Sequence, residues 1–286
     1  MKVLVTGGEG FIGRNIIDEA INKNWETISI DVSGRKSHSQ EFHNISILNR
    51  KDIMKIFKDV DIVFHNAAVT SPPEFEEKPN FGFETNVMGT FNVLEAAREN
   101  GVKKVILASS SSIYGNSVKT TSEEDLDTEF INFYPMTKYF NEIMANLFGK
   151  DSTTETVLLR YFNTYGVGEN SKGFYSSVIH KFITDIKNGK RPVIFGDGTQ
   201  SRDFIFVKDV AQANLMVALR GKSTSSYNVG TGVTTTFNEI FNIIKEEMKS
   251  DISPTYSKNP FKSYQMYTKA DISKITKEIG FNQILL

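Results

Sequence analysis

Cysteine is absent from the 286-residue sequence. This absence excludes disulfides, thiolate catalysis and cysteine-ligated metal sites. No apolar run approaches the roughly 20 residues that a membrane-spanning helix needs. No charge of one sign dominates either, since 33 basic residues stand against 34 acidic ones, which argues against a nucleic-acid partner. Because an apolar run begins almost at once and leaves no room for a signal peptide, we expect a soluble cytoplasmic protein with no membrane partner.

A glycine-rich turn lies close to the N-terminus. Residues Thr6–Gly13 follow a short apolar run and open an amphipathic segment over 11–21. Strand, turn and helix in this order are what a dinucleotide pyrophosphate site requires, because the free amides of a helix N-terminus bind phosphate. Gly7 would make the tight turn, Gly10 would let the backbone approach the phosphates, and Gly13 would let helix and strand pack closely.

Apolar periodicity alternates between strand-like and helical patterns over about 160 residues. This alternation predicts an α/β fold with a Rossmann-like, doubly wound parallel sheet. The expected strands are Val3–Thr6, Thr27–Ile30, Ile45–Leu48, Ile62–His65, Val105–Ala108 and Thr156–Leu159, and the expected helices lie near 11–22, 51–58, 84–100 and 135–148.

The second half of the chain is less regular and predicts a smaller lobe. A strand is expected at Phe204–Val207, followed by a helix that Asp209 caps. Thr236 and Glu239 form a capping box before a further helix. Two lobes imply a cleft, which is the usual place for a ligand. The expected division is an NAD-binding domain at 1–165, with 196–220 returning to it, and a substrate-binding lobe at 166–195 and 221–286.

An acidic residue, Asp31, ends the second expected strand, 18 residues after Gly13. A carboxylate there can accept both ribose hydroxyls of adenosine and would repel a 2′-phosphate, which favours NAD over NADP. Arg35 and Lys36 follow closely and could bind such a phosphate. An Asp at a strand end can also be a simple turn former, but the nearby glycine turn favours the ribose role.

A tyrosine and a lysine, Tyr134 and Lys138, lie one helical turn apart, and Pro135 fits the first position of their helix. A buried ammonium, with a positive nicotinamide ring nearby, would lower the pKa of Tyr134 and make it a usable general acid/base. The serine run 109–112 follows the strand expected at 105–108, whose C-terminal end faces the cofactor in such a sheet. A serine there can hydrogen-bond a substrate alcohol, although serine runs also cap loops.

These motifs occur in one order, and the ordered set resembles the extended short-chain dehydrogenase/reductase family, particularly its NAD-dependent nucleotide-sugar epimerases and dehydratases. The resemblance covers residues 1 to about 280. Besides the motifs above, it is carried by His65-Asn66-Ala67-Ala68, by Asn86 within Thr85–Thr90, by Arg160-Tyr161-Phe162-Asn163, and by Phe195–Phe204, which is similar to the segment that holds the nucleotide diphosphate.

The resemblance implies a role for each matching residue. The implied catalytic residues are Ser110, Tyr134 and Lys138. The residues implied to contact NAD are Gly7, Gly10, Phe11, Ile12, Gly13, Asp31, Leu48, Ala67, Ala68, Asn86, Ser109, Tyr134, Lys138 and Tyr161. The residues implied to contact the sugar nucleotide are Ser110, Asn163, Lys172, Phe195 and Arg202, the last on the phosphates because a guanidinium forks onto phosphate oxygens. No metal site is expected.

The chain departs from the family pattern at three places. Ile47 stands where an acid often binds the adenine amine, which weakens the expected adenine pocket. Asn66 replaces a residue that is usually apolar. A second phosphate-binding arginine is not evident near 260, where Lys262 is the candidate substitute.

The resemblance favours an epimerase. Ser111 and Ser112 stand where the 4,6-dehydratases carry an Asp-Glu pair, so a dehydratase or reductase is the weaker interpretation. In an epimerase, Tyr134 would take a proton from a sugar hydroxyl while hydride passes to NAD and then returns to the other face. A UDP-glucose/UDP-galactose 4-epimerase-like activity is favoured.

Three further expectations accompany this interpretation. The alternative activity is that of an ADP-glycero-manno-heptose 6-epimerase. The segments 228–232 and 264–271 resemble that type of enzyme, in which a lysine matching Lys172 is thought to be a second acid/base. A non-catalytic NAD-binding sensor is the alternative of another class, although such proteins typically lose the tyrosine or the lysine. The family usually forms homodimers through two helices per subunit, which match 84–100 and 135–148.

Overall fold

The protein is built on a seven-stranded sheet in which all neighbouring strands are parallel. The computed structural model describes residues 1–34, 36, 38–70, 75, 77–126, 129–130, 132–260 and 264–284. The strand order from β3 to β6 is that of the doubly wound dinucleotide-binding sheet, so the predicted fold class is confirmed. In sheet order the strands are β11 (Ser225–Val229), β6 (Glu155–Tyr161), β5 (Lys104–Ser110), β4 (Ile62–His65), β1 (Lys2–Thr6), β2 (Glu26–Asp31) and β3 (Glu41–Asn44).

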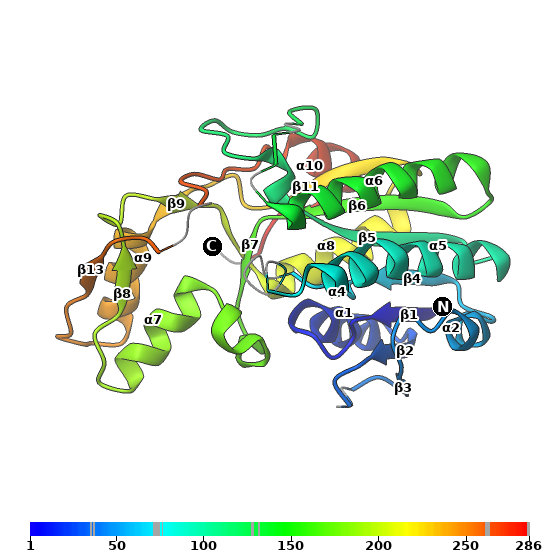
Figure 1. Ribbon diagram of the computed structural model, residues 1–286, viewed down its shortest axis with the longest axis horizontal. Coiled ribbons are helices and arrows are strands. Elements are labelled where there is room, and N and C mark those ends of the chain that lie inside the picture. The colour runs from blue at the N-terminus through cyan, green and yellow to red at the C-terminus, as the bar shows by residue number, and fades with distance from the viewer. Residues whose placement is uncertain are drawn as a thin grey trace.

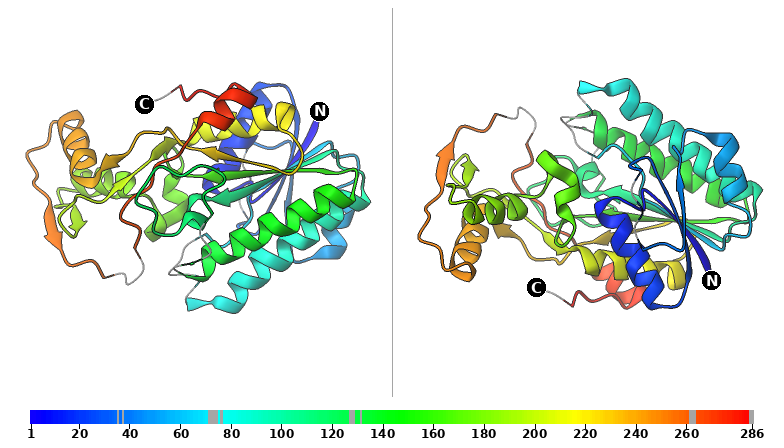
Figure 2. Two further views of the ribbon diagram at one scale, coloured as in Figure 1. Left: turned by 90° about the horizontal axis from the view of Figure 1, so that it is seen from above. Right: turned by 90° about the horizontal axis from the view of Figure 1, so that it is seen from below.

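Helices cover both faces of this sheet (Figures 1 and 2). Side chains of β1 alternate between the two cores, with Val3 and Val5 in one cluster and Leu4 in the other, all of them fully buried. None of the helices in the described part of the chain is long and apolar enough to cross a membrane. One face carries α1 (Phe11–Asn22), α8 (Val207–Arg220) and α10 (Ser273–Ile279), and the other carries α2 (Arg50–Ile56), α5 (Gly89–Glu99) and α6 (Phe133–Asp151).

A smaller lobe lies beyond the C-terminal edge of the sheet, at the left of Figure 1. Its own core includes Phe182, Ile194 and Phe241. Short paired strands lead into it from the main sheet. The lobe contains α7 (Val178–Lys187), α9 (Phe237–Glu247) and the pair β8 (Val193–Phe195) and β13 (Thr255–Ser257); the connecting pairs are β7 (Asn163–Tyr165) with β10 (Phe204–Phe206), and β9 (Ser201–Arg202) with β12 (Thr235–Thr236).

The expected assignment of 221–286 to the smaller lobe is wrong in part. Strand β11 is an edge strand of the main sheet, where Tyr227 and Val229 are fully buried in the same core as α1. Helix α10 packs against β11 and α8. The main sheet therefore takes back two segments of the C-terminal region.

Two local predictions also differ from the structure. The strand expected at 45–48 is not formed, because the chain turns there, with the Asn49 N–H donating to the Ser46 carbonyl, and β3 lies earlier. Helix α8 begins at Val207, since Phe206 is its extended N-cap, and Asp209 lies in the first turn instead. The capping box of Thr236 and Glu239 is confirmed.

Candidate active site

The glycine turn joins β1 to α1 at the C-terminal edge of the sheet. Gly7 adopts a φ of 67°, which favours glycine, and its N–H donates to the Ile30 carbonyl at 2.8 Å. A Cβ on Gly13 would lie 2.1 Å from the Gly7 carbonyl oxygen, so no other residue fits at that position. The N-cap of α1 is Gly10, which offers no side chain to the first amides of the helix. No side chain in the described part of the chain caps these amides, which can therefore bind an anion.

The residues expected to contact the adenosine half of NAD lie beside this turn. The Asp31 carboxylate accepts the Glu9 N–H at 3.0 Å, which holds the acid at the end of β2 against the glycine turn. The Ala67 main chain lies so close that a Cβ on Gly7 would be 2.8 Å from its nitrogen. Leu48 lies in the turn after β3, and its N–H donates to the Ser46 hydroxyl. The contacts of these residues with a cofactor stay predictions.

The protein fits a dinucleotide at this place. The Asn66 amide carries a buried oxygen and a buried nitrogen, neither of which has a hydrogen-bond partner among the described residues. The Arg14 Nε atom, in the first turn of α1, is buried and unpartnered as well. Because unsatisfied buried polar groups are costly, their concentration beside an uncapped helix N-terminus indicates a polar ligand.

The expected catalytic residues meet where β5 ends and α6 begins. The Asn132 side chain caps α6 by accepting the Tyr134 N–H at 3.1 Å. Ser110, the last residue of β5, hydrogen-bonds the Tyr134 side chain. Lys138 donates from Nζ to the Ala108 carbonyl at 2.8 Å, and this atom lies 6.0 Å from the centre of the Tyr134 ring. The structure therefore brings the three residues together.

The pKa of Tyr134 differs from the expectation. Burial raises the pKa of Tyr134 to about 12, and the hydrogen bond from Ser110 opposes this only in part. Burial lowers the pKa of Lys138 to about 8, against the opposing charge of Glu142. The described residues of the protein therefore do not supply the lowered tyrosine pKa that the sequence predicted.

Asn86 supports the catalytic helix from behind. It lies in a π-helical turn, η1 (Glu84–Met88), between α4 (Pro79–Phe83) and α5. Its amide donates to the Val69 carbonyl and to the Thr137 hydroxyl, and its oxygen accepts the Val69 N–H. Thr137 in turn donates to the Tyr134 carbonyl at 2.8 Å. The side chain of Asn86 thus holds α6 in place, and its amide is fully engaged by the protein.

Two expected cofactor contacts have hydroxyls that are already paired. Ser109 donates to Glu142 at 2.5 Å, and the Tyr161 hydroxyl donates to Asn214 at 2.9 Å. Both residues are buried, and their hydroxyl protons are engaged, so their hydroxyls could only accept a hydrogen bond from a cofactor and could not donate one without losing these partners. The sequence analysis missed Glu142, although an acid one turn beyond Lys138 on the same helix face was a readable signal.

Arg202 is a buried cation without a carboxylate partner among the described residues. Its guanidinium lies 5.6 Å from the Phe237 ring centre and 5.1 Å from that of Tyr264. Among the described residues it donates to main-chain carbonyls, those of Ser201 and Gln265. Its neighbour in sequence, Asp203, instead accepts hydrogen bonds from residues 231, 232 and 270. A planar, stacked guanidinium that no described carboxylate neutralises suits a phosphate ligand.

The other expected substrate residues occupy different surroundings. Asn163 accepts the Thr268 hydroxyl at 3.0 Å, close to the segment that covers Arg202. Phe195 lies on β8 in the smaller lobe, and its carbonyl accepts the Gln200 side chain. Lys172 packs beside the glycine turn, with Nζ 4.6 Å from the ring centre of Phe11, the first residue of α1. Lys262 lies outside the described residues.

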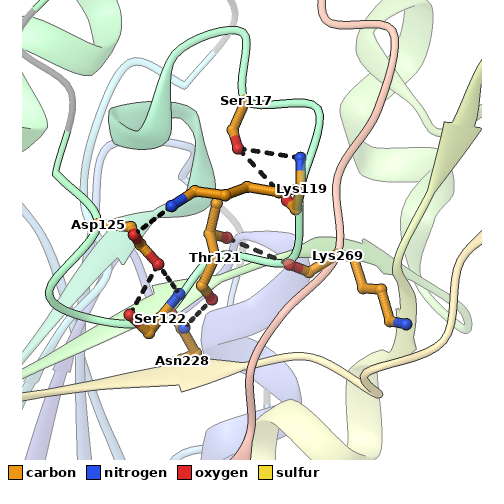
Figure 3. A network of polar contacts seen from close by, with 7 residues as sticks. All are labelled: Ser117, Lys119, Thr121, Ser122, Asp125, Asn228 and Lys269. Atoms are coloured by element: carbon orange, nitrogen blue, oxygen red, sulfur yellow. Dashed lines mark hydrogen bonds and ion pairs between the residues drawn. The ribbon is translucent and has the colours of Figure 1, made fainter.

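A polar network fixes the loop that follows the serine run (Figure 3). Thr121 donates from its N–H and its hydroxyl to the Lys269 carbonyl, and its own carbonyl accepts the Asn228 amide. Lys119 pairs with Asp125 at 2.7 Å in the same loop. The segment that contains Lys269 also contains Tyr264, whose ring stacks on Arg202. These hydrogen bonds therefore connect the loop to the surroundings of Arg202.

Comparison with known proteins identifies close relatives. Residues 3–230 match the model of the NAD dependent epimerase/dehydratase family. The chain is 39% identical over 253 residues to a putative UDP-glucose 4-epimerase of Methanocaldococcus jannaschii, covering 86% of this chain and 82% of that protein. It is 31% identical to the ADP-L-glycero-D-manno-heptose-6-epimerase of Brachyspira hyodysenteriae, covering 96% and 90%. The solved UDP-N-acetylglucosamine 4-epimerase of Methanobrevibacter ruminantium superposes with a TM-score of 0.92 at 34% identity, covering 99% and 92%.

Proposed function

Because the chain belongs to the NAD dependent epimerase/dehydratase family, we propose that it inverts carbon 4 of a hexose carried by uridine diphosphate. The observation that carries the proposal is that the partly buried Ser110 and the buried Tyr134 and Lys138 lie together at the end of β5. The relatives named above that act at carbon 4 support the choice of this carbon. The buried Arg202 supports a diphosphate substrate.

Each catalytic residue has a task in this reaction. Tyr134 accepts the proton of the sugar hydroxyl and later returns it, while Ser110 hydrogen-bonds the oxygen that alternates between alcohol and ketone. Lys138, fixed on the Ala108 carbonyl, keeps its ammonium 6.0 Å from the centre of the Tyr134 ring, where its charge would add to that of the nicotinamide ring in favouring the phenolate. NAD, when bound, accepts one hydride and gives it back to the same carbon. No net oxidation results, so the cofactor can stay bound between cycles.

The two residues that follow Ser110 do not offer the acid and base that a dehydratase needs. Ser111 and Ser112 follow Ser110 in a 3-10 turn, η2 (Ser111–Tyr114), and neither can act as the acid or base that expels water. Expulsion of a hydroxyl needs a proton donor at the leaving oxygen. Epimerisation needs only the tyrosine and the returned hydride, which supports the epimerase assignment.

One observation favours a second candidate substrate. The segment around Tyr264 and Thr268, which resembles that of the heptose 6-epimerases, packs directly on Arg202 and Asn163. The similarity to the Brachyspira enzyme covers this region. An ADP-heptose is therefore the alternative substrate, with the same tyrosine chemistry at carbon 6.

A substrate panel tests the proposal. The purified protein is incubated with UDP-glucose, UDP-N-acetylglucosamine, GDP-mannose and ADP-heptose without added reductant, and products are identified by proton NMR. We expect inversion at carbon 4 of a uridine diphosphate hexose. Inversion of ADP-heptose alone would replace the proposed substrate, and net accumulation of NADH would argue for a dehydrogenase.

We further propose a homodimer formed through the helices around 84–100 and 135–148. Exposed apolar side chains line one face of α6 at i, i+3 and i+7 spacing, and more lie on the adjacent α4 and η1. Phe140→Lys combined with Ile143→Glu should convert a dimer into a monomer in light scattering, whereas Ile243→Lys on the smaller lobe should not. The exposed apolar residues are Phe81, Met88, Phe133, Phe140, Ile143 and Leu147.

A further inference from the structure

A loop between β7 and α7 passes over the first turn of α1. It contains three glycines with positive φ, Gly166 at 134°, Gly168 at 94° and Gly173 at 52°, which allow it to change direction sharply. A Cβ on Gly168 would lie 3.2 Å from the Arg14 side chain and 3.9 Å from the Phe11 ring. The loop is therefore seated on the turn of α1 whose amides are free to bind phosphate.

Lys172 is the residue of this loop whose side chain extends to the glycine turn before α1. Its ammonium lies 4.6 Å from the Phe11 ring centre, within cation–π range. Phe11 is the first residue of α1, so the ammonium lies beside the helix N-terminus. Its side chain is 31% exposed, which leaves Nζ able to contact a bound ligand.

The only carboxylate near this lysine among the described residues is already occupied. Glu169 is 2% exposed, accepts the Ser177 N–H at 2.5 Å, and accepts the Ser177 hydroxyl at 2.9 Å. Its distance to the Lys172 ammonium is 3.9 Å, which is long for an ion pair. Glu169 thus connects the start of the loop to Ser177 at its end, and the charge of Lys172 remains largely available for an anion.

We propose that Lys172 binds the pyrophosphate of NAD and so fastens the loop over the cofactor, in place of a role as second acid/base at the sugar. A cation at this point complements the two negative charges that the α1 amides alone would have to balance. It also gives a reason for a cofactor that stays bound through many cycles. The inference rests on the proposed function only through NAD, and is independent of which sugar is epimerised.

The test compares cofactor fragments on the protein freed of nucleotide, by isothermal titration calorimetry. ADP-ribose retains the pyrophosphate without nicotinamide, and adenosine lacks both. For Lys172→Gln we expect an ADP-ribose Kd about 10- to 100-fold higher, as for loss of one charge-assisted hydrogen bond, with the adenosine Kd unchanged. Lys172→Arg should retain most of the affinity.

Lys181→Gln is the matched control, because Lys181 on α7 also faces Glu169 and is partly buried. It should bind ADP-ribose as the wild type does. Thermal unfolding of all variants separates a lost contact from a lost fold.

Two results would overturn the proposal. If Lys172→Gln binds ADP-ribose normally but loses turnover with an altered pH profile, the lysine is an acid/base. If it weakens UDP binding to the NAD-loaded protein and leaves ADP-ribose unaffected, it belongs to the substrate. Failure of the wild type to invert a uridine diphosphate hexose would instead reject the proposed function and leave this comparison intact.

Discussion

Glu142 and Arg160 form a two-point ion pair in the protein interior, with Oε1 3.0 Å from Nε and Oε2 2.7 Å from Nη2. Their side chains are 4% and 3% exposed. The same carboxylate accepts the Ser109 hydroxyl and carries the charge that opposes the burial of Lys138. One buried acid therefore connects three neighbouring elements, β5, β6 and α6, directly behind the catalytic residues.

Glu142→Gln should destabilise the protein by about 3–5 kcal/mol, because it leaves the Arg160 guanidinium buried without a counter-charge. Urea unfolding measures this loss. The matched control is Glu155→Gln, which removes an exposed partner of Lys104 and should cost less than about 1 kcal/mol. Equal losses in the two variants would show that the interior pair contributes no more than a surface pair.

His65 should make the protein acid-sensitive. Burial, assisted by the nearby charge of Lys138, lowers the pKa of His65 to about 3, whereas the unfolded value is near 6.5. The unfolded state therefore binds one more proton between these two pH values. The contribution of His65 to the free energy of unfolding is fully present above pH 6.5 and is lost as the pH drops towards 3, by about 4–5 kcal/mol in all.

His65→Gln removes this titration while its amide can still reach Thr6 and Thr90, which bond the two ring nitrogens. The free energy of unfolding of the variant should fall less between pH 7 and pH 4 than that of the wild type. Parallel slopes would contradict the account.

The sequence predicted the sheet well, and its failures have physical reasons. Apolar alternation locates buried strands, but Ile47 is buried against Gly89 from a turn, so burial there did not mean a strand. The placement of Lys172 on Phe11 joins residues far apart in the chain, and it depends on glycine conformations that no local pattern reveals. The Tyr134 pKa depends on burial, which spacing alone does not measure.

Arg202→Gln should raise the KM for the sugar nucleotide about 10- to 100-fold, because one charge-assisted contact with the diphosphate is lost. The NAD Kd should not change, because Arg202 stacks on Tyr264 and on Phe237 of the smaller lobe, whereas the expected NAD site is at the glycine turn of the main sheet. Arg191→Gln is the control, because Arg191 is an exposed arginine that donates to carbonyls at 253 and 254. Steady-state kinetics and NAD titration distinguish the two; an unchanged KM in Arg202→Gln would remove it from the phosphate site.

Tyr134→Phe should lower turnover about 10²- to 10⁴-fold, the usual contribution of a general acid/base, while NAD still binds. The variant keeps the ring and its packing and removes only the hydroxyl that Ser110 contacts. Full activity in this variant would exclude the proposed proton transfer, whatever the substrate.

The fate of the hydrogen on carbon 4 tests the central claim most directly. The wild type is incubated with UDP-glucose carrying deuterium at carbon 4, without added cofactor, and the product is examined by NMR and mass spectrometry. We predict UDP-galactose with deuterium still on carbon 4, because the hydride leaves and returns within one closed site. Product that has lost the label to solvent, or unlabelled product beside labelled NADH in solution, would contradict the retained-cofactor mechanism.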